Sequence, residues 1–513
     1  MDATPGKAPA ATRFPRLCVS AASGGGGKTL LSLGLARAFR EAGLTVKPFK
    51  KGPDYIDAAW LGRAAGMPAT NLDPFFLTGP KLAALFARAM DAAAPPDSAR
   101  LGLIEGNRGL YDGLDEAGSR STATLARALA CPVLLCLNAA KMTRTAVALL
   151  SGLLHFEPGL RFCGVVFNRV GSPRHEAVLR RMVEAHLPLP VLGALPRLGH
   201  DPLPERHMGI ASTGASLSAE ADAILNGLAA LVRAHVDVDA VLASAREAPP
   251  LPGAEAESAG EASAREAVYP SVSTLPPAPS RSPATPKERP RIGYVRDAAF
   301  WFYYPENLDA LAEAGAEPVP LSLADAPESE APLWDTLDGL YLGGGFPEDF
   351  LPQLSGSPRL ARVAELARAG LPVYAECGGM ILLSRGMERE GVFWPLGGAL
   401  PLRMVWTARP QGLGYVEGVV RAANPFFPMG LSLRGHEFHY SRSIRDADAP
   451  PPALRLSRGS GTGPESGQAR AGDGIVLLRT WAAYTHIFAP AVPCWAPNFV
   501  AAARAALRAR ARR

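Results

Sequence analysis

The chain has 513 residues, of which 48 % are hydrophobic and 20 % are charged, and its formal net charge is +5. This length predicts roughly two to four domains, and the composition is typical of a globular protein with sizeable buried cores. The small net charge argues against a dedicated nucleic-acid-binding protein, in which Lys and Arg gather on one face. The basic run at residues 504–513 is interpreted as the solvated end of a helix.

The beginning of the chain and its cysteines indicate a cytoplasmic protein. Residues 1–15 are rich in Ala, Pro and Thr, lack the apolar core of a secretory signal, and are expected to form a disordered tail. No apolar run is long enough to span a membrane. The six Cys residues include no C-x-x-C pair, which argues against zinc or thioredoxin-type chemistry. No disulfide framework is evident, as expected in a reducing compartment.

Short apolar runs alternate with longer helical patterns in residues 16–237. Such alternation, with strands that are apolar throughout, predicts a parallel sheet covered by helices on both faces. We therefore predict an α/β fold whose first domain covers residues 16–237. The expected strands are 17–21, 101–105, 133–138 and 163–168, and the helical patterns between them include 29–42 and 123–130.

The composition changes at about residue 238. Residues 238–290 are dominated by Ala, Pro, Ser and Glu and have few large apolar side chains, so they cannot bury enough surface to offset their chain entropy. We predict a flexible linker here, with an ordered strap across the domains as the alternative. A second α/β pattern covers residues 291–513, with strands expected at 291–295, 339–342 and 373–375 and helices at 305–314 and 359–369.

A glycine-rich loop follows the first expected strand and opens a helix. Glycines allow backbone N–H groups to turn toward a phosphate, and a helix N-terminus adds positive potential. In such P-loops the Lys reaches the terminal phosphates of ATP and the Thr hydroxyl ligates Mg²⁺. The standard pattern would place Gly where this chain has Ala22, and a flexible Gly-rich turn is the alternative. The residues assigned to the phosphate site are Gly24, Gly25, Gly26, Gly27, Lys28 and Thr29.

Two acidic clusters, residues 50–57 and 105–113, accompany this loop. Glu105 ends an apolar strand, and ligands of open α/β sheets bind beyond the carboxyl ends of the strands. Mg²⁺ prefers carboxylate, hydroxyl and phosphate oxygens, so Thr29, Asp54 and Glu105 form a plausible set of ligands. Each carboxylate taken alone could equally be a helix cap or a loop residue.

These clusters resemble those of the cobyrinic acid a,c-diamide synthases, a family related to the cobyric acid synthases and to dethiobiotin synthetase. The resemblance rests on the run K-G-P-D-Y-I-D at residues 51–57 and on E-G-x-x-G-L-Y-D-G at residues 105–113. Members commonly carry a phosphate loop that departs from the standard pattern. The variable pair is Asn107-Arg108, where Val-Met or a similar pair is expected, and this departure leaves the identity of the tetrapyrrole substrate open.

The resemblance implies roles for further residues of the first domain. The set Thr29, Asp54 and Glu105 would hold Mg²⁺ and ATP. Asp57 and Asp112 would orient the substrate carboxylate or its phosphorylated intermediate. Asn168, at the end of an expected strand, would contact adenine; the alternative for Asn168 is a helix or turn cap.

The second domain contains a nucleophile-elbow pattern. Cys377 follows the apolar strand at 371–376 and precedes Gly378, Gly379 and a helical run, which places the thiol at a strand-to-helix corner. A helix N-terminus lowers the pKa of a Cys thiol, so we expect a reactive Cys377, with a buried structural Cys as the alternative. The N–H groups of Gly378 and of Gly345, in the loop at 343–345, could form an oxyanion hole.

Three histidines, His436, His439 and His486, could serve as the base, and spacing does not choose among them. The domain resembles the class I glutamine amidotransferases, which have a flavodoxin-like α/β fold, and specifically their cobyrinate-type branch, which shares the run G-H-E-F-H-Y-S at residues 435–441. The resemblance implies that His486 is the base. Ordinary class I domains have Glu two residues after the base, where this chain has Phe488, so we expect a dyad without a third member and a low basal glutaminase activity.

The resemblance covers nearly the whole chain and implies an ATP- and glutamine-dependent amidation of the a and c carboxylates of cobyrinic acid through acyl phosphates. The expected partners are a tetrapyrrole and L-glutamine, without nucleic acid or membrane, and a homodimer is compatible with the sequence. Alternative substrates are sirohydrochlorin, its nickel form and hydrogenobyrinic acid, and a cobyric acid synthase is a further alternative. A non-catalytic partitioning-type ATPase is the alternative from another class, but it leaves Cys377 and His486 unexplained.

Overall fold

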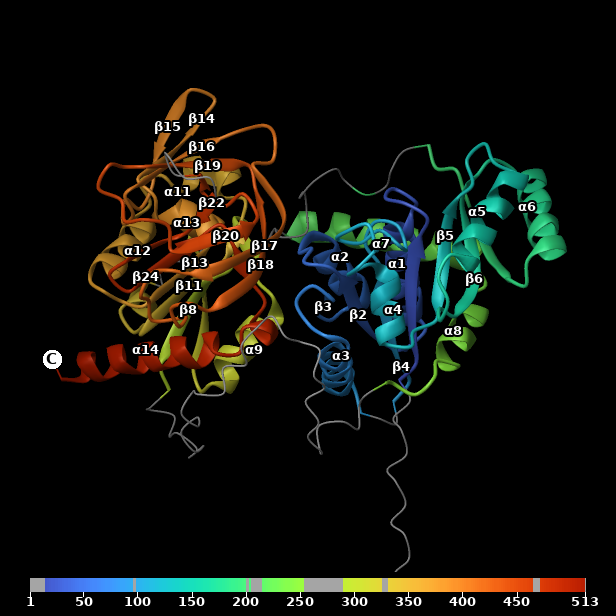
Figure 1. Cartoon of the computed structure of the whole chain (residues 1–513), viewed down its shortest axis with the longest axis horizontal. Helices are drawn as coiled ribbons and strands as arrows, with labels where there is room; N and C mark the ends of the chain where they lie inside the picture. Colours follow the sequence, from blue (N-terminus) through green and yellow to red (C-terminus); the bar gives the residue numbers. More distant parts are fainter. Residues whose placement is uncertain are drawn as a thin grey trace, which may run out of the picture. The chain divides into compact units, whose positions relative to one another are not determined.

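The computed structural model describes residues 14–95, 98–199, 203, 215–252, 289–324, 331–464 and 471–512. The chain divides into two compact units, residues 1–205 with 220–283 and residues 206–219 with 284–513. Figure 1 shows both units as mixtures of helices and strands. The predicted α/β fold class is therefore confirmed.

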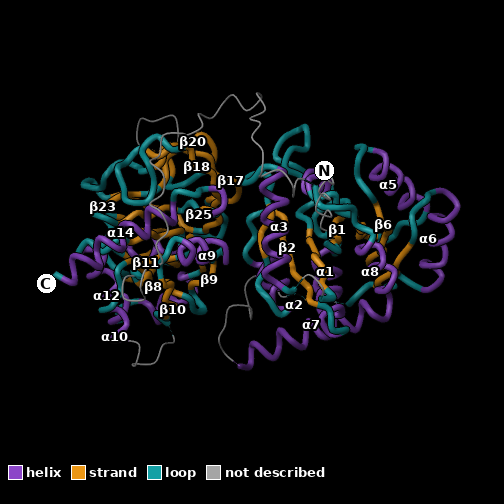
Figure 2. The backbone as a smooth tube through the Cα atoms, turned by 90° about the horizontal axis from the view of Figure 1, so that it is seen from below, coloured by secondary structure: helices purple, strands orange, loops and turns teal. Residues whose placement is uncertain are grey.

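The first unit is built on a seven-stranded sheet in the order β3-β2-β4-β1-β5-β6-β7. All neighbouring strands are parallel. Every residue of β1 and β4 is buried, as expected when helices cover both faces of a parallel sheet. Figure 2 shows these strands among the helices. The strands are β1 (Arg16–Ala21), β2 (Thr45–Lys51), β3 (Thr70–Leu72), β4 (Arg100–Glu105), β5 (Val133–Asn138), β6 (Phe162–Val170) and β7 (Val191–Pro196).

The helices of this unit include one that the sequence analysis assigned to the linker. Helix α8 (Val238–Arg246) begins at Asp237, whose side chain accepts a hydrogen bond from Ala240 N, and it buries Val241 and Ala245. The spacing of these two apolar residues puts both on one helix face, so the linker prediction is wrong for this segment; residues 1–13 and 253–288 lie outside the described residues. The other helices are α1 (Lys28–Glu41), α2 (Ile56–Ala65), α3 (Gly79–Ala93), α4 (Thr122–Ala128), α5 (Arg144–His155), α6 (Pro173–His186) and α7 (Ala215–His235).

Arg16 ties the segment after α8 to the sheet. Its side chain is buried, and burial lowers the pKa of its guanidinium. The guanidinium donates to four backbone carbonyls: Phe14 O at 2.9 Å, Leu129 O at 2.7 Å, Ala130 O at 3.2 Å and Pro249 O at 2.7 Å. This cation therefore joins the start of β1, the end of α4 and the residues beyond α8.

We expect Arg16→Met to destabilise the first unit by roughly 2–4 kcal/mol, because buried carbonyls lose their donor. Denaturant unfolding of the full chain, followed by the intensity of far-UV circular dichroism, measures the shift. Arg233→Met is the control, since Arg233 forms an exposed ion pair with Glu41, and such pairs contribute about 0–1 kcal/mol. Equal shifts for the two variants would contradict a structural role for Arg16.

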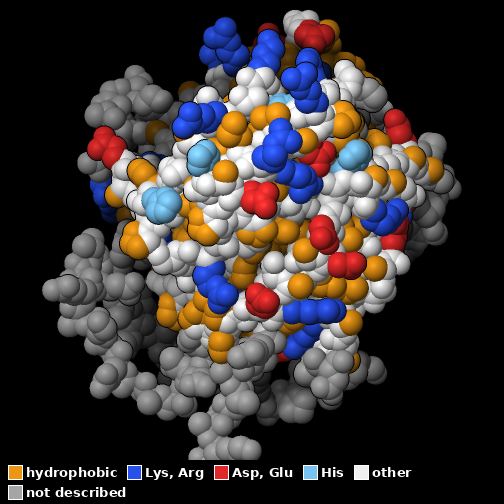
Figure 3. Space-filling view, turned by 90° about the vertical axis from the view of Figure 1, so that its right-hand side faces the viewer, with side chains coloured by type: hydrophobic (Ala, Val, Ile, Leu, Met, Phe, Trp, Pro, Cys, Tyr) orange, Lys and Arg blue, Asp and Glu red, His pale blue; other side chains and the backbone are white. Residues whose placement is uncertain are grey.

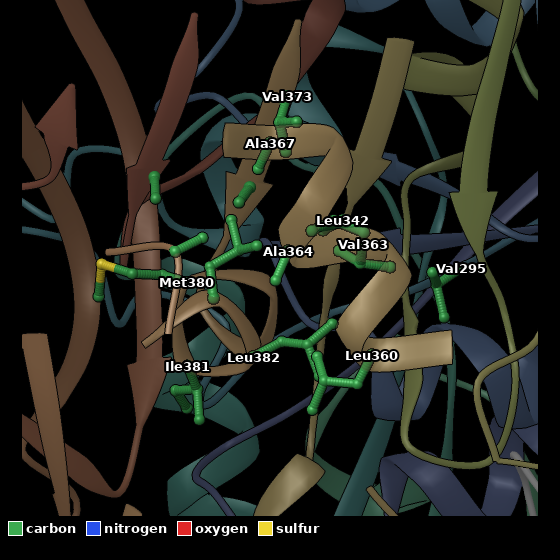
Figure 4. Close-up of a cluster of buried hydrophobic side chains, with 14 of the residues drawn as sticks. Val295, Leu342, Leu360, Val363, Ala364, Ala367, Val373, Met380, Ile381 and Leu382 are labelled. Atoms are coloured by element: carbon green, nitrogen blue, oxygen red, sulfur yellow. The ribbon is translucent and has the colours of Figure 1, made fainter. Parts of the chain in front are cut away.

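The second unit contains a six-stranded sheet in the order β10-β8-β11-β13-β24-β23, in which only the pair β23–β24 is antiparallel. Side chains alternate between two cores: Leu340 and Leu342 belong to one and Tyr341 to the other. In Figure 4, Val363 and Ala367 of helix α12 (Pro358–Arg368) pack toward Leu342 and Val373. The strands are β8 (Arg291–Val295), β10 (Glu317–Leu321), β11 (Gly339–Leu342), β13 (Val373–Glu376), β23 (Ile475–Leu477) and β24 (Thr480–Ala483).

Helices cover this sheet, and several are short. Two of them were predicted from the sequence, at residues 305–314 and 359–369. The helices are α9 (Pro305–Glu313), α10 (Ala331–Trp334), α11 (Leu351–Leu354), α12 (Pro358–Arg368), α13 (Gly378–Leu383) and α14 (Trp495–Ala511), with 3₁₀ turns η3 (Pro347–Phe350) and η4 (Ala489–Ala491).

Smaller sheets, which the sequence analysis did not predict, complete the second unit. Strands β18 and β25 pair antiparallel and place His436 opposite His486. The strands are β9 (Phe300–Phe302) with β12 (Gly344–Gly345); β14 (Gly386–Arg389), β15 (Val392–Pro395), β16 (Leu402–Trp406) and β19 (Ser441–Arg445); and β17 (Gly412–Val420), β18 (Ser432–His439), β20 (Leu454–Arg458), β21 (Gly463–Pro464), β22 (Ala471–Asp473) and β25 (His486–Ile487).

The surface carries interspersed charges. On the face seen in Figure 3, Lys and Arg side chains alternate with Asp and Glu side chains among apolar and neutral ones. Among the residues that the structure describes, no helix combines the length and the apolar composition needed to cross a bilayer.

Candidate active sites

The first site lies where three neighbouring strands end. Strand β4 lies between β2 and β1, with Lys50 of β2 and Val19 of β1 in register with Glu105. The glycine-rich loop follows β1 and ends at Gly27, which has a left-handed φ of 96° and precedes α1. The parallel arrangement therefore brings the phosphate loop and both acidic clusters to one edge of the sheet, as the sequence predicts for a ligand site.

A buried lysine organises the charges at this edge. Lys50 Nζ lies 2.9 Å from Glu105 Oε1 and 2.5 Å from Asp57 Oδ2, and Thr29 Oγ1 donates to Glu105 Oε1 at 2.7 Å. Burial alone would lower the pKa of Lys50, but Glu105 and Asp57 together raise it above its usual value. No role was predicted for Lys50 from the sequence, although a lysine that opens one acidic cluster at the end of an expected apolar stretch signals such a pair.

Asp54 and Asp112 make local contacts. Asp54 Oδ1 accepts hydrogen bonds from Ile56 N at 2.8 Å and Asp57 N at 3.1 Å, at the start of α2. Burial, reinforced by Asp57, raises the pKa of Asp54 to about 6. Asp112 is exposed, and its Oδ2 accepts from Gly109 N at 2.8 Å. These contacts fix the backbone of the segments at 54–57 and 109–112. Both segments follow strands that end at the same edge of the sheet as the phosphate loop.

The oxygen atoms near Thr29 fit a hard cation. Glu105 Oε2 is buried and finds no hydrogen-bond partner among the described residues, and the Thr29 hydroxyl is bound to the other oxygen of the same carboxylate. Within the part of the chain that the structure describes, no three His, Cys, Asp or Glu residues are placed to enclose a metal. A Mg²⁺ ion here would therefore need oxygens from a substrate as well, as is usual for Mg²⁺ bound with nucleotide phosphates.

A cavity of about 1010 Å³ opens beside the phosphate loop. Its lining combines Gly25, Gly27, Lys28 and Thr29 with residues that follow β5, β6 and β7. Burial and the neighbouring Lys50 lower the pKa of Lys28. The lining also includes residues that were not predicted from the sequence: Lys141, Met142, Thr143, Arg169, Arg197 and Leu198.

Asn168 lines this cavity and also braces the loop. Its Nδ2 donates to Gly26 O at 3.2 Å, and a Cβ added at Gly27 would lie 1.9 Å from the same Nδ2. Gly26 is closely packed, since its Cβ would meet Ala21 Cβ at 2.8 Å, whereas a Cβ at Gly24 would find open space. The contact between Asn168 and the loop requires Gly at position 27; its contact with adenine stays a prediction.

The second site lies where β11 and β13 end side by side. Cys377 follows β13 with φ 46° and ψ −97°, a backbone conformation that costs energy for a non-glycine residue. The oxyanion candidates are neighbours, because Gly345 N lies 3.1 Å from the position that a Gly378 Cβ would take. This is the strand-to-helix elbow that the sequence predicts.

The expectation of a lowered Cys377 pKa is wrong for this structure. Burial, together with the nearby Glu348 carboxylate, raises the pKa of the thiol well above its usual value. Helix α13 has only six residues, so its dipole is short, and the Sγ donates to Phe438 O at 3.5 Å. Cys377 therefore needs a base to become a nucleophile.

The three candidate histidines have different surroundings. The ring of His486 lies against the loop at residues 343–345, since a Cβ at Gly344 would meet its Cε1 at 2.4 Å. The ring of His436 stacks on that of His486 with centroids 4.9 Å apart, and burial lowers the pKa of His436 well below its usual value. His439 stacks on Tyr484 with centroids 3.6 Å apart. His486 is thus the candidate whose ring contacts the loop at residues 343–345.

The structure also supplies a carboxylate that the sequence analysis missed. Position 488 is Phe, but the carboxylate of Glu376 lies 3.4 Å from His486 Nδ1. The prediction of a dyad without a third member did not include this carboxylate beside His486. A charged residue closing an otherwise apolar strand, directly before the candidate nucleophile, was the signal in the sequence.

Both halves of the chain match described domain families. Residues 17–210 match the CobQ/CobB/MinD/ParA nucleotide binding domain, and residues 291–492 match the CobB/CobQ-like glutamine amidotransferase domain. A protein of Magnetococcus marinus named cobyrinate a,c-diamide synthase is 38 % identical over 94 % of this chain and 96 % of its own length. The chain belongs to the cobyrinate a,c-diamide synthase family.

Other relatives carry the same name. The protein of Syntrophotalea carbinolica is 40 % identical over 85 % of this chain and 88 % of its own length, and that of Methanosarcina barkeri is 32 % identical over 96 % of both. Family membership makes the chain a ligase that has glutamine as its amide donor. The partitioning-type ATPase is not favoured, since the relatives match along both units.

Proposed function

We propose that the chain converts the a and c side-chain carboxylates of cobyrinic acid to carboxamides, with ATP and glutamine as co-substrates, in cobalamin biosynthesis. The observation that carries the proposal is the presence in one chain of two sites with complementary chemistry. The first combines a phosphate-type loop with a charged cluster and a cavity large enough for a nucleotide. The second combines Cys377, a base candidate and two N–H donors. Relatives matched along nearly their whole length bear the corresponding name.

The first unit would activate the carboxylate. A substrate carboxylate oxygen attacks the γ-phosphorus of ATP, ADP leaves, and an acyl phosphate forms. Such transfers depend on positioning and on neutralising charge, and Lys28 at the start of α1 provides a cation for the terminal phosphates. Asn168 would hold the loop and contact adenine from the cavity wall.

Thr29, Asp54 and Glu105 are the residues that would hold Mg²⁺. When bound, this ion would neutralise charge on the ATP phosphates. Asp57 and Asp112 would orient the incoming carboxylate or the acyl phosphate. Lys50 would keep Asp57 and Glu105 in place and limit the repulsion between their carboxylates.

The second unit would release ammonia. Cys377, deprotonated by His486, attacks the side-chain amide carbon of glutamine, and the C–N bond breaks after His486 returns the proton to the leaving ammonia. The N–H groups of Gly345 and Gly378 stabilise the oxyanion. Water then hydrolyses the thioester to glutamate, while ammonia attacks the acyl phosphate to give the amide and phosphate. A second cycle amidates the other carboxylate.

We expect Gly344→Ala to lower glutamine-dependent amidation by about 10²-fold or more, because the new methyl group occupies the place of the His486 ring and displaces the base. Ammonia-dependent amidation should remain, since the first unit is unchanged. Initial rates with each nitrogen source test this. A loss with both sources would show that the substitution damages the chain generally.

The function is tested by incubating the protein with Mg·ATP, glutamine and one tetrapyrrole at a time. The substrates are cobyrinic acid, hydrogenobyrinic acid and sirohydrochlorin with and without nickel, and mass spectrometry counts the amidations. Two amidations of cobyrinic acid are expected. Amidation of another tetrapyrrole only would replace the substrate, whereas ATP hydrolysis without amidation of any of them would overturn the proposal.

A further inference from the structure

The last residue of β13, Glu376, lies in a fixed and fully buried position. Its Oε1 accepts a hydrogen bond from Ile487 N at 3.0 Å, and its Oε2 accepts from Tyr341 Oη at 3.0 Å and lies 3.4 Å from His486 Nδ1. The exposed fraction of the side chain is zero for both Glu376 and His486. A carboxylate that is removed from water in this way needs hydrogen-bond partners; Ile487 N and Tyr341 Oη are two donors to it, and His486 Nδ1 is its third polar neighbour.

A second layer of contacts holds these donors. Asn307 Nδ2 donates to Tyr341 Oη at 3.1 Å and to Ile487 O at 3.0 Å, and Asn307 Oδ1 accepts from Ala489 N at 2.7 Å. Asn307 therefore fixes both the tyrosine that binds the carboxylate and the residue that follows the histidine. Contacts of this kind fix the orientation of a functional side chain.

We propose that Glu376 is the positioning residue of the glutaminase site and holds His486 as the tautomer protonated on Nδ1. An ionised carboxylate can only accept hydrogen bonds, so the proton on Nδ1 faces Glu376. Nε2 is then the ring nitrogen that takes the thiol proton and returns it to the leaving ammonia. A buried carboxylate has this effect on the histidine of serine hydrolases, where replacing it by an amide favours the wrong tautomer.

The topology explains how this carboxylate replaces the one absent at position 488. Strands β13 and β24 are paired, and Cys377 N donates to Ala483 O at 2.7 Å, so the chain beyond β24 returns His486 to the end of β13. The carboxylate of Glu376 and the thiol of Cys377 belong to consecutive residues at this end of β13. His436, the other titratable ring stacked on His486, has a pKa lowered by burial and adds no positive charge that would compete for Glu376.

The inference rests on the proposed glutaminase function and is tested with Glu376→Gln. We expect kcat for glutamine hydrolysis to fall by about 10²-fold or more, with KM for glutamine within about threefold. Ammonia-dependent amidation should be unchanged. In a His486→Ala background, Glu376→Gln should cause no further loss, because residues that act through one group are not additive. A merely structural role would lower activity in that background as well.

Glu437 offers a matched control, because it is a second buried carboxylate beside a histidine, 3.5 Å from His439 Nε2. Equal losses in Glu437→Gln and Glu376→Gln would overturn the proposal. If Glu376→Gln does not fold, Tyr341→Phe removes one donor to the carboxylate; a loss of about 3- to 10-fold, absent in the His486→Ala background, is expected, and full activity would overturn the proposal. Retained glutamine use in Cys377→Ala would instead remove Cys377 from the mechanism, whereas the absence of glutamine-dependent amidation in the unaltered protein would refute the proposed function itself.

Discussion

Cys377→Ala is expected to abolish glutamine-dependent amidation while leaving amidation with free ammonia intact. Removing a catalytic nucleophile costs several orders of magnitude, about 10³-fold at the least. The first unit keeps its phosphate loop and charged cluster in this variant, so carboxylate activation continues. Rates of amide formation with glutamine and with ammonium chloride, each with Mg·ATP and cobyrinic acid, measure the two activities separately.

Cys494→Ala is the matched control for this experiment. Cys494 belongs to the same unit and is partly exposed at the start of α14. We expect this variant to keep both activities. Glutamine-dependent amidation that survives in Cys377→Ala would remove Cys377 from the mechanism, and loss of the ammonia-dependent activity would show that the alanine disturbs more than the thiol chemistry.

The parallel sheets could be predicted because their strands are continuous apolar runs. The strands expected at 133–138, 291–295 and 339–342 have the observed bounds, and the other expected strands differ by one or two residues at one or both ends. Six strands of the two main sheets were not predicted: β2, β3, β7, β10, β23 and β24. Helix α8 was missed because a composition rich in Ala, Pro, Ser and Glu concealed Val241 and Ala245, whose burial depends on the neighbouring sheet. The strands β14–β22 and β25, most of whose pairings are antiparallel, depend on pairing between distant segments, which local patterns do not encode.

The candidate sites also combine residues that the sequence predicts with contacts that it does not predict. Lys28, Thr29, Glu105 and Cys377 stand in local motifs: the first two begin α1 after the glycine-rich loop, Glu105 ends β4, and Cys377 directly follows β13. Lys50 and Glu105 are in contact although they are 55 positions apart in the sequence. Glu376 and His486 are in contact although they are 110 positions apart. The burial that raises the pKa of Cys377 is likewise a property of the assembled second unit. Such relations require the sheet order, which the sequence motifs do not specify.

Lys28→Met should abolish amidation with both nitrogen sources, in contrast to Cys377→Ala. Lys28 lies at the start of α1 and lines the cavity beside the glycine loop. Removing one preorganised charge that stabilises a transferring phosphoryl group costs about 10²- to 10³-fold in rate. Methionine keeps much of the apolar stem of lysine, so the variant removes the ammonium with little change in volume. Rates with glutamine and with ammonia should therefore fall together.

Nucleotide binding provides an independent measurement of the same variant. Mg·ATP at about 100 times its dissociation constant should stabilise the native protein by roughly 2.7 kcal/mol, and the thermal midpoint should rise accordingly. We expect Lys28→Met to reduce this rise, while Lys81→Met, at an exposed position of α3, should keep it. An unchanged rise together with unchanged amidation in Lys28→Met would show that the glycine loop is a structural turn, and the nucleotide would then have to bind elsewhere.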